Sequence, residues 1–397
     1  MKKIVLFAAL LFLVFALAAC GNNEDNSNEP NESVTDQDKI KDPAFDGVDP
    51  DEELVYPQNP QKYVVKYIRE MAMTPWTPKQ TFQLYGKYQA WSYNLTYEEG
   101  VKYYGPPFLV DSRGTMQEFQ NSIEDGVYVG GTSDASCIGS ACYDAVYVTL
   151  IQVCPSISFE STADMLPGNN TGLLPVGDWD TTVSKHDTKE IMDAHTITEM
   201  AEAYALLKPG DVVLKHLVSQ DAGHTRIVSD GPVVYYNNDG TINFNKSYIL
   251  TIEQTNAWDK NVSHHTTWWV DHMYTFDQLY KTFFVPLTPE DYTKDVTNAF
   301  ISSEDIITAD SIVKARRLKG TLKSNHYITE VKVTISNDEG KELYTCSAFP
   351  NEKEFDLKNM PYTARLIEYK SGNYHFNLEA SLSFGTKTIA DYDFVLE

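Results

Sequence analysis

A cysteine and a histidine stand in sequence contexts that suit nucleophilic catalysis. Cys142 opens an apolar, helix-like run and follows the small residues 139–141, where the backbone can approach a substrate closely. A thiol at a helix N-terminus lies at the positive end of the helix dipole, which is expected to lower its pKa and favour the thiolate. Such a thiolate attacks a carbonyl carbon, and it needs a base within reach.

His224 is the candidate base, and Glu253 is the candidate group that orients it. His224 follows a turn at residues 220–223, which comes after the apolar strand 211–214. Glu253 ends the strand-like run 248–254, where its carboxylate can bind the imidazole and fix its tautomer. Two plainer interpretations compete with this one: His224 as a structural histidine, and Glu253 as a solvated residue at a strand end.

The remaining cysteines leave alternatives open. Cys142 also fits a buried core cysteine, because free cysteines are often buried. Cys137 is the rival nucleophile, although no apolar run follows it directly. Cys137 and Cys154 could form one disulfide, which spacing does not decide. No Cys–His spacing matches a zinc site, so neither a metal nor a cofactor is predicted.

Helices are expected to carry part of the site. Apolar residues at helical spacing predict a helix over residues 61–73. Capping residues predict that further helices begin at four threonines: Thr77, Thr96, Thr115 and Thr196.

The strands that follow are expected to carry His224 and Glu253. Residues 212–252 predict three or four antiparallel strands, with an Asp-Gly hairpin turn at 237–240. A short helix over 274–280 and a strand over 284–287 are predicted to complete this sheet. Residues 154–195 are polar and rich in Gly and Pro, which predicts a long loop near the site.

The order of these residues resembles the papain-like peptidases of the NlpC and CHAP type. The resemblance covers residues 60–290 and includes Leu-Lys-Pro-Gly-Asp-Val-Val at 207–213 and Gly-Pro-Pro-Phe at 105–108. It implies that Cys142 forms an acyl-enzyme, that His224 is the base and that Glu253 holds the imidazole. The sequence departs from the NlpC pattern around the cysteine. Ala141 replaces the usual Asp, and Tyr143-Asp144 replaces the usual Ser-Gly pair.

The N-terminal end has the features of an exported lipoprotein. A basic start and a short apolar run end in Leu-Ala-Ala-Cys at 17–20, which resembles a lipobox. Residues 1–20 are therefore predicted to be a signal peptide, and Cys20 the lipidated residue that anchors the chain at the extracellular face of the membrane. An ordinary signal peptide is the alternative. Residues 21–57 are acidic and poor in apolar residues, which predicts a disordered tether.

The chain divides further into two folded parts. Residues 58–295 are predicted to form the papain-like domain. Residues 296–397 change to period-two patterning, which predicts a β-sandwich that resembles the immunoglobulin-like domains of bacterial surface proteins. The fold class is therefore α+β: helices on a small antiparallel sheet, followed by a β-sandwich.

Charge and location narrow the function. A formal net charge of −24 argues against nucleic-acid binding. An exported, anchored cysteine hydrolase would meet cell-wall peptide first, so hydrolysis of an amide bond in such a peptide is the leading hypothesis. A non-catalytic surface lipoprotein that binds wall or protein ligands on a papain-like scaffold is the second. A solute-binding lipoprotein is a weaker third, because it should show two similar α/β lobes.

Overall fold

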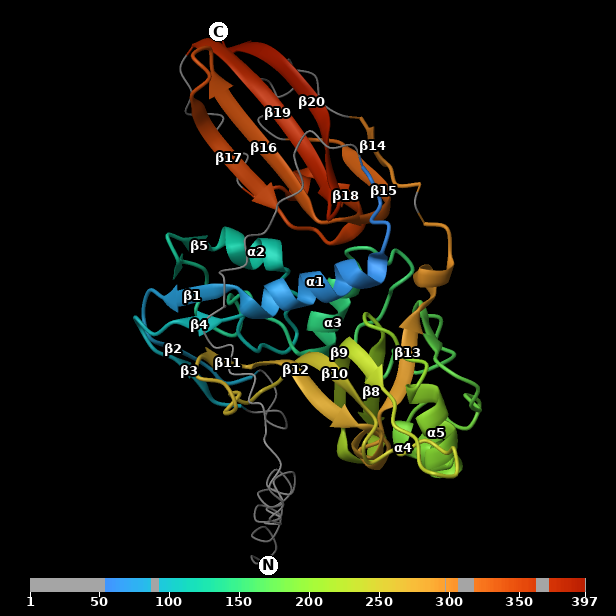
Figure 1. Cartoon of the computed structure of the whole chain (residues 1–397). Helices are drawn as coiled ribbons and strands as arrows, with labels where there is room; N and C mark the ends of the chain where they lie inside the picture. Colours follow the sequence, from blue (N-terminus) through green and yellow to red (C-terminus); the bar gives the residue numbers. More distant parts are fainter. Residues whose placement is uncertain (1–53, 87–92, 297, 306–317, 362–370, 397) are drawn as a thin grey trace, which may run out of the picture. The chain divides into compact units, whose positions relative to one another are not determined.

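The computed structural model describes residues 54–86, 93–296, 298–305, 318–361 and 371–396 (Figure 1). All of the described residues belong to one compact unit. The fold is α+β, with few helices and many strands in several sheets. The predicted signal peptide, Cys20 and nearly all of the predicted tether lie outside the described residues. Within those residues, no helix has the length and apolar character needed to cross a membrane.

The first helix, α1 (Pro60–Met73), confirms the helix predicted over 61–73. Asn59 caps it, because its Oδ1 accepts a hydrogen bond of 2.8 Å from the Lys62 backbone N–H. One face of the helix is buried at helical spacing: Val64, Tyr67, Ile68, Met71 and Ala72.

A six-stranded antiparallel sheet carries the candidate base. Its strand order is β12-β10-β9-β8-β13-β7. The strands are β12 (Trp268–Thr275), β10 (Tyr248–Gln254), β9 (Ala222–Val233), β8 (Val212–Leu217), β13 (Val285–Pro289) and β7 (Leu173–Pro175). Helix α3 (Cys142–Leu150) packs against β9 and β10, so the helix that begins at Cys142 lies on the strands that carry His224 and Glu253.

A second, five-stranded sheet holds an aromatic core. Its strand order is β11-β4-β1-β6-β5. Strands β2 and β3, which lie between β1 and β4 in the chain, form a separate two-stranded sheet. The strands are β11 (His265–Thr266), β4 (Tyr103–Tyr104), β1 (Pro75–Pro78), β6 (Val127–Tyr128), β5 (Ile123–Glu124), β2 (Phe82–Leu84) and β3 (Leu95–Tyr97). Large rings fill the space between them: Trp76, Phe82, Tyr97, Tyr103, Phe119 and Tyr128.

This core explains why two predicted helices are wrong. Thr77 lies in β1 and Thr96 in β3, although the residues around each match a helix-capping pattern. Trp76 and Tyr97 are buried on these short strands and their rings pack at 5.3 Å between centroids, which overrides the local capping signal. The prediction at Thr115 is confirmed, since its Oγ1 caps α2 (Met116–Asn121) through the Glu118 N–H at 3.2 Å.

The segment predicted as a long loop is only partly irregular. It contributes β7 to the main sheet and contains α4 (Thr188–Ala194), which Asp187 caps. Helix α5 (Ile197–Tyr204) begins at Thr196 with a reciprocal capping box, as predicted. Helix α6 (Phe276–Lys281) and β13 also match the predicted elements. Short 3₁₀ turns lie at η2 (Val218–Gln220), η3 (Glu290–Thr293) and η4 (Leu357–Asn359).

The C-terminal part consists of two antiparallel sheets, ordered β14-β15-β18 and β17-β16-β19-β20. Their strands are β14 (Ile301–Glu304), β15 (Thr321–Ile328), β18 (Glu352–Asp356), β17 (Glu342–Ala348), β16 (Glu330–Asn337), β19 (Gly372–Leu382) and β20 (Gly385–Leu396). Alternate residues of β16 and β19 are buried, which confirms the period-two pattern.

Two glycines allow the packing next to the aromatic core to be tested. Gly105 and Gly100 both have positive φ, at 72° and 77°. A Cβ at Gly105 would lie 2.4 Å from Trp268 Cδ1, whereas a Cβ at Gly100 would meet nothing within 4 Å. We expect Gly100→Ala to lose about 1 kcal/mol of unfolding free energy through backbone strain alone. Gly105→Ala should lose a further ~1–3 kcal/mol from overpacking. Urea unfolding of both variants measures the difference, and equal losses would contradict the tight contact with Trp268.

Candidate functional site

Cys142 is the first residue of α3, and a carboxylate further along the helix caps that end. Ala141 occupies the N-cap position in extended conformation, and its methyl group cannot accept a hydrogen bond. Asp144, in the first turn, supplies the other half of a capping box, because its Oδ2 accepts a hydrogen bond of 3.4 Å from the Ala141 N–H. Nearly every side chain of α3 is buried, so the helix is held on all sides.

The segment that leads into Cys142 is anchored to two other segments. The Ser140 N–H donates to the Pro107 carbonyl at 3.1 Å, and the Leu109 N–H donates to the Ser140 carbonyl at 3.0 Å. Ser140 Oγ donates to Gln254 Oε1 at 2.5 Å, which ties the segment to the end of β10. Gly139 is required here, since a Cβ would lie 2.5 Å from the Pro107 carbonyl oxygen. These contacts fix the position of the Cys142 backbone.

His224 and Glu253 meet as predicted. They lie on the neighbouring strands β9 and β10, and the His224 Nε2–H donates to Glu253 Oε2. The carboxylate is almost completely buried, and the imidazole side chain is 18% exposed. Because Nε2 is bound to Glu253, Nδ1 is the nitrogen left to exchange a proton with a nucleophile.

Glu253 binds two further donors that sequence reasoning missed. The Arg226 Nε donates to its Oε2 at 2.7 Å, and the Tyr274 hydroxyl donates to its Oε1 at 2.6 Å. Burial alone would raise the pKa of Glu253, but Arg226 and His224 outweigh it and hold the pKa well below its usual range. The carboxylate is therefore charged throughout the physiological range.

The same surroundings favour a neutral imidazole. Burial lowers the pKa of His224 below its ordinary value, and the positive charges of Arg226 and Lys215 act in the same direction. The Glu253 carboxylate opposes them without reversing the shift.

Cys142 and His224 line one cavity of about 550 Å³. The Cys142 sulfur lies against the backbone N–H of Thr225, the residue after His224, and this hydrogen bond favours the thiolate. Among the described residues, no hydrogen bond joins the sulfur to the imidazole. The other lining residues are Phe108, Val110, Ala141, Tyr143, Ser161, Thr162, Ala163, His216, Asp221, Ala222, Gly223, Thr255 and Asn256.

The predicted lowering of the thiol pKa is wrong. Burial raises the pKa of Cys142 to about 12, and the Asp144 carboxylate raises it further. The Thr225 and Tyr143 N–H groups act in the opposite direction but do not compensate. The site at rest therefore holds a protonated thiol and a neutral imidazole rather than a thiolate–imidazolium pair.

The rival cysteines occupy different surroundings. Cys137 lies in the aromatic core, where Tyr128 Oη donates to its sulfur at 3.7 Å, and burial raises its pKa to about 12. Cys154 is buried in the main core. Both are free thiols, so the disulfide considered for Cys137 and Cys154 is not formed. Cys142 is also free and is the cysteine that shares a cavity with His224.

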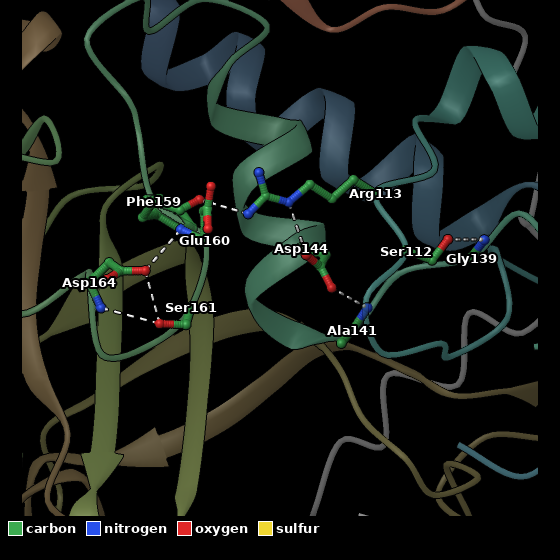
Figure 2. A network of polar contacts seen from close by, with 9 residues as sticks. All are labelled: Ser112, Arg113, Gly139, Ala141, Asp144, Phe159, Glu160, Ser161 and Asp164. Carbon is green, nitrogen blue, oxygen red and sulfur yellow. Dashed lines mark hydrogen bonds and ion pairs between the residues drawn. The ribbon is translucent and has the colours of Figure 1, made fainter. Parts of the chain in front are cut away.

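A polar network joins the first turn of α3 to the loop at 159–164 (Figure 2). Arg113 lies between them: its Nε donates to Asp144 Oδ1 at 3.2 Å and its Nη2 donates to the Phe159 carbonyl at 2.7 Å. Burial raises the pKa of Asp144 to about 7 against the opposing charge of Arg113. Because this loop supplies Ser161 and Thr162 to the cavity wall, Arg113 fixes the wall and the Cys142 helix together.

A second histidine, His216, also lines the cavity and was missed. Its Nδ1 lies 3.0 Å from Thr162 Oγ1, and Thr162 packs so closely on the hairpin that a Cβ at Gly223 would lie 1.9 Å from that oxygen. No sequence signal distinguished His216, whereas Arg226 could have been found because it shares the strand face of His224 at period two.

Comparison of the chain with known protein families, with curated proteins and with solved structures finds no match. Within the described ranges, no group of three or more His, Cys, Asp or Glu side chains is arranged to hold a metal ion.

The protonation state of the thiol makes a testable prediction. At pH 7, iodoacetamide should alkylate Cys142 at least about 10-fold more slowly in the folded chain than in urea, because the folded thiol is a poor source of thiolate. The folded-state rate should rise by about tenfold per pH unit between pH 7 and 9. Peptide mapping by mass spectrometry assigns the label, with Cys142→Ser as the control. Fast labelling that does not change with pH would indicate a preformed thiolate and contradict this description.

Proposed function

We propose that this chain is an exported cysteine hydrolase with a papain-like fold of the NlpC and CHAP type, followed by an immunoglobulin-like β domain. One observation carries the proposal: a free cysteine at a helix N-terminus shares a cavity with a histidine whose Nε2 is held by a buried carboxylate. This is the nucleophile, base and orienting group that amide hydrolysis requires. The two antiparallel sheets of residues 301–396 support the second part.

In this mechanism the proton moves during the attack. Neutral His224 accepts the Cys142 proton at Nδ1 while the sulfur attacks the substrate carbonyl carbon, since the resting thiol is protonated. The Thr225 N–H stabilises the charge that develops on the sulfur. The N–H of Cys142, at the start of α3, is a donor for the oxyanion. The imidazolium then protonates the leaving amine, and water activated by His224 releases the acid.

The substrate assigned is a peptide of the cell wall. An anchor on Cys20 would hold the enzyme at the extracellular face of the membrane, where wall peptide is the nearest abundant amide substrate. The cavity of about 550 Å³ is large enough for several side chains of a peptide. The net charge of −24 does not favour nucleic acid as a ligand.

A second candidate is a non-catalytic surface lipoprotein that binds a peptide in the same cavity. The raised pKa of Cys142, together with the lack of a sulfur–imidazole hydrogen bond among the described residues, favours this reading. It predicts ligand binding that survives the loss of either side chain. The hydrolase reading predicts that both are needed for turnover.

The decisive experiment uses the chain without residues 1–20 and purified bacterial cell wall. Mass spectrometry should detect new amine and carboxyl ends released by the unmodified enzyme. Cys142→Ala should abolish them, and His224→Ala should lower kcat/KM by about 10²–10⁴-fold. Cys137→Ser serves as the matched control and should keep full activity. No new ends, or ends released equally by Cys142→Ala, would leave the binding protein as the better description.

The pH dependence provides an independent check. The base form of His224 is needed for attack, and its pKa lies below the ordinary 6.5. We therefore expect kcat/KM to rise with pH through a value below 6.5. Stopped assays on a released fragment across pH 4–8 measure this limb. An inflection well above pH 7 would mean that a group other than neutral His224 limits the reaction.

A further inference from the structure

Arg226 occupies an environment that is unusual for a cation. Its side chain is 10% exposed, and its Nε donates to the Glu253 carboxylate at 2.7 Å. The guanidinium carbon lies 3.8 Å from the centre of the Tyr274 ring and 4.0 Å from the centre of the Phe284 ring. Its Nη1 is buried and has no hydrogen-bond partner among the described residues.

Stability does not account for this arrangement. A buried ion pair loses most of its attraction to the cost of removing both charges from water, and apolar side chains of similar size often replace such pairs without loss. The unpaired Nη1 of Arg226 adds to that cost. The two aromatic rings offset part of it, but they would pack equally well on an apolar side chain. A different role is needed to explain the presence of Arg226.

We propose that Arg226 is a positioning residue that holds Glu253 as a carboxylate and cancels its charge, so that Glu253 orients His224 without converting it to an imidazolium. This inference rests on the proposed function of the cavity. A carboxylate next to an imidazole normally draws a proton onto the ring. With Arg226 bound to the same oxygen atom, the carboxylate fixes Nε2–H and leaves Nδ1 as a free base.

Charged groups on the neighbouring elements also act on the protonation of His224. Lys215 on β8 lies opposite His224 and disfavours the imidazolium. Tyr274 on β12 keeps its proton, because burial and the charge of Glu253 raise its pKa, and it donates to Glu253. On α3, Cys142 lines the same cavity as His224, and the Asp144 carboxylate acts on the thiol. Arg226 is the cation that contacts Glu253 directly.

The test measures protonation without any substrate. NMR titration of the chain without residues 1–20, labelled with ¹⁵N-histidine, follows the pH at which the His224–Glu253 pair takes up its first proton. Arg226→Met should raise that pH by about 1–3 units, because the carboxylate loses its compensating charge. Arg226→Lys should stay near the unmodified protein. The double variant Arg226→Met with Glu253→Gln should return toward it, since both charges are then absent.

Two variants keep the test decisive. Arg69→Met is the control, because Arg69 also pairs with a carboxylate, that of Asp271, at N–O distances of 2.5 and 2.7 Å. An equal shift in Arg69→Met, or no shift in Arg226→Met, would overturn the inference. If Arg226→Met does not fold, Glu253→Gln alone should lower the pKa of His224 by about 1 unit or more, and an unchanged pKa would overturn it.

The NMR and activity results together distinguish failure of the role proposed for Arg226 from failure of the proposed hydrolase function. A shift in Arg226→Met without any Cys142-dependent hydrolysis would support the role of Arg226 and overturn the hydrolase. Hydrolysis whose acid limb moves upward in Arg226→Met, and is restored by Arg226→Lys, would support both. Hydrolysis with an unmoved acid limb and an unmoved NMR titration would support the enzyme and overturn the role of Arg226.

Discussion

The buried charge of Glu253 is the constraint on which the rest of the site depends. A carboxylate removed from water is costly unless donors replace its hydration, and here three donors do so from two strands that flank β10. His224 and Arg226 come from β9 and Tyr274 from β12. A slip of one residue between β9 and β10 would turn both β9 side chains to the opposite face and leave the carboxylate with Tyr274 alone. Correct pairing of the sheet and correct orientation of the imidazole are therefore the same structural condition.

The thiol shows the balance between two opposing electrostatic effects. A helix N-terminus stabilises a nearby anion by about 0.3–2 kcal/mol, which corresponds to at most about 1.5 pKa units. Complete burial shifts a pKa by up to about 3–5 units in the opposite direction. Cys142 is only 9% exposed, so burial outweighs the dipole. The burial that surrounds Cys142 thus disfavours a preformed thiolate.

The elements that carry the site could be predicted because their patterns are local. The apolar run after Cys142 predicted α3, and period-two spacing predicted the strands of His224 and Glu253. The capping pattern at Thr77 failed because a threonine before polar residues looks the same in a strand as at a helix start. The neighbouring Trp76 is buried in a ring cluster that assembles from distant segments, and this long-range packing decided the outcome.

Charge compensation could not be predicted from the sequence, because it depends on which strands become neighbours. Tyr274 is 21 residues from Glu253 in the chain and reaches it only because β12 pairs with β10. The function of Asp144 was also hidden. Its partner Arg113 is 31 residues away in the chain, so no local pattern connects the two.

Two buried carboxylates therefore flank the cavity, and each is paired with an arginine that stacks on a tyrosine. Asp144 faces Arg113, whose guanidinium lies 4.0 Å from the Tyr147 ring centre, and Glu253 faces Arg226 in the same manner. The two ion pairs differ in length and in exposure. Arg113 Nε lies 3.2 Å from Asp144 Oδ1, and the Arg113 side chain is 33% exposed. Arg226 Nε lies 2.7 Å from Glu253 Oε2, and the Arg226 side chain is 10% exposed. Glu253 also binds His224, which lowers its pKa further, whereas Asp111 raises the pKa of Asp144. The pKa therefore shifts upward to about 7 for Asp144 and downward for Glu253.

The carboxyl groups of Glu253 and Asp144 therefore behave differently near neutral pH. Glu253 stays charged and keeps His224 oriented, whereas Asp144 exchanges a proton as pH passes about 7. When Asp144 is protonated, the negative charge that raises the pKa of Cys142 disappears, which makes the thiol easier to deprotonate. Acidification therefore acts on His224 and Cys142 in opposite directions, since it protonates the imidazole while it removes the charge that raises the pKa of the thiol.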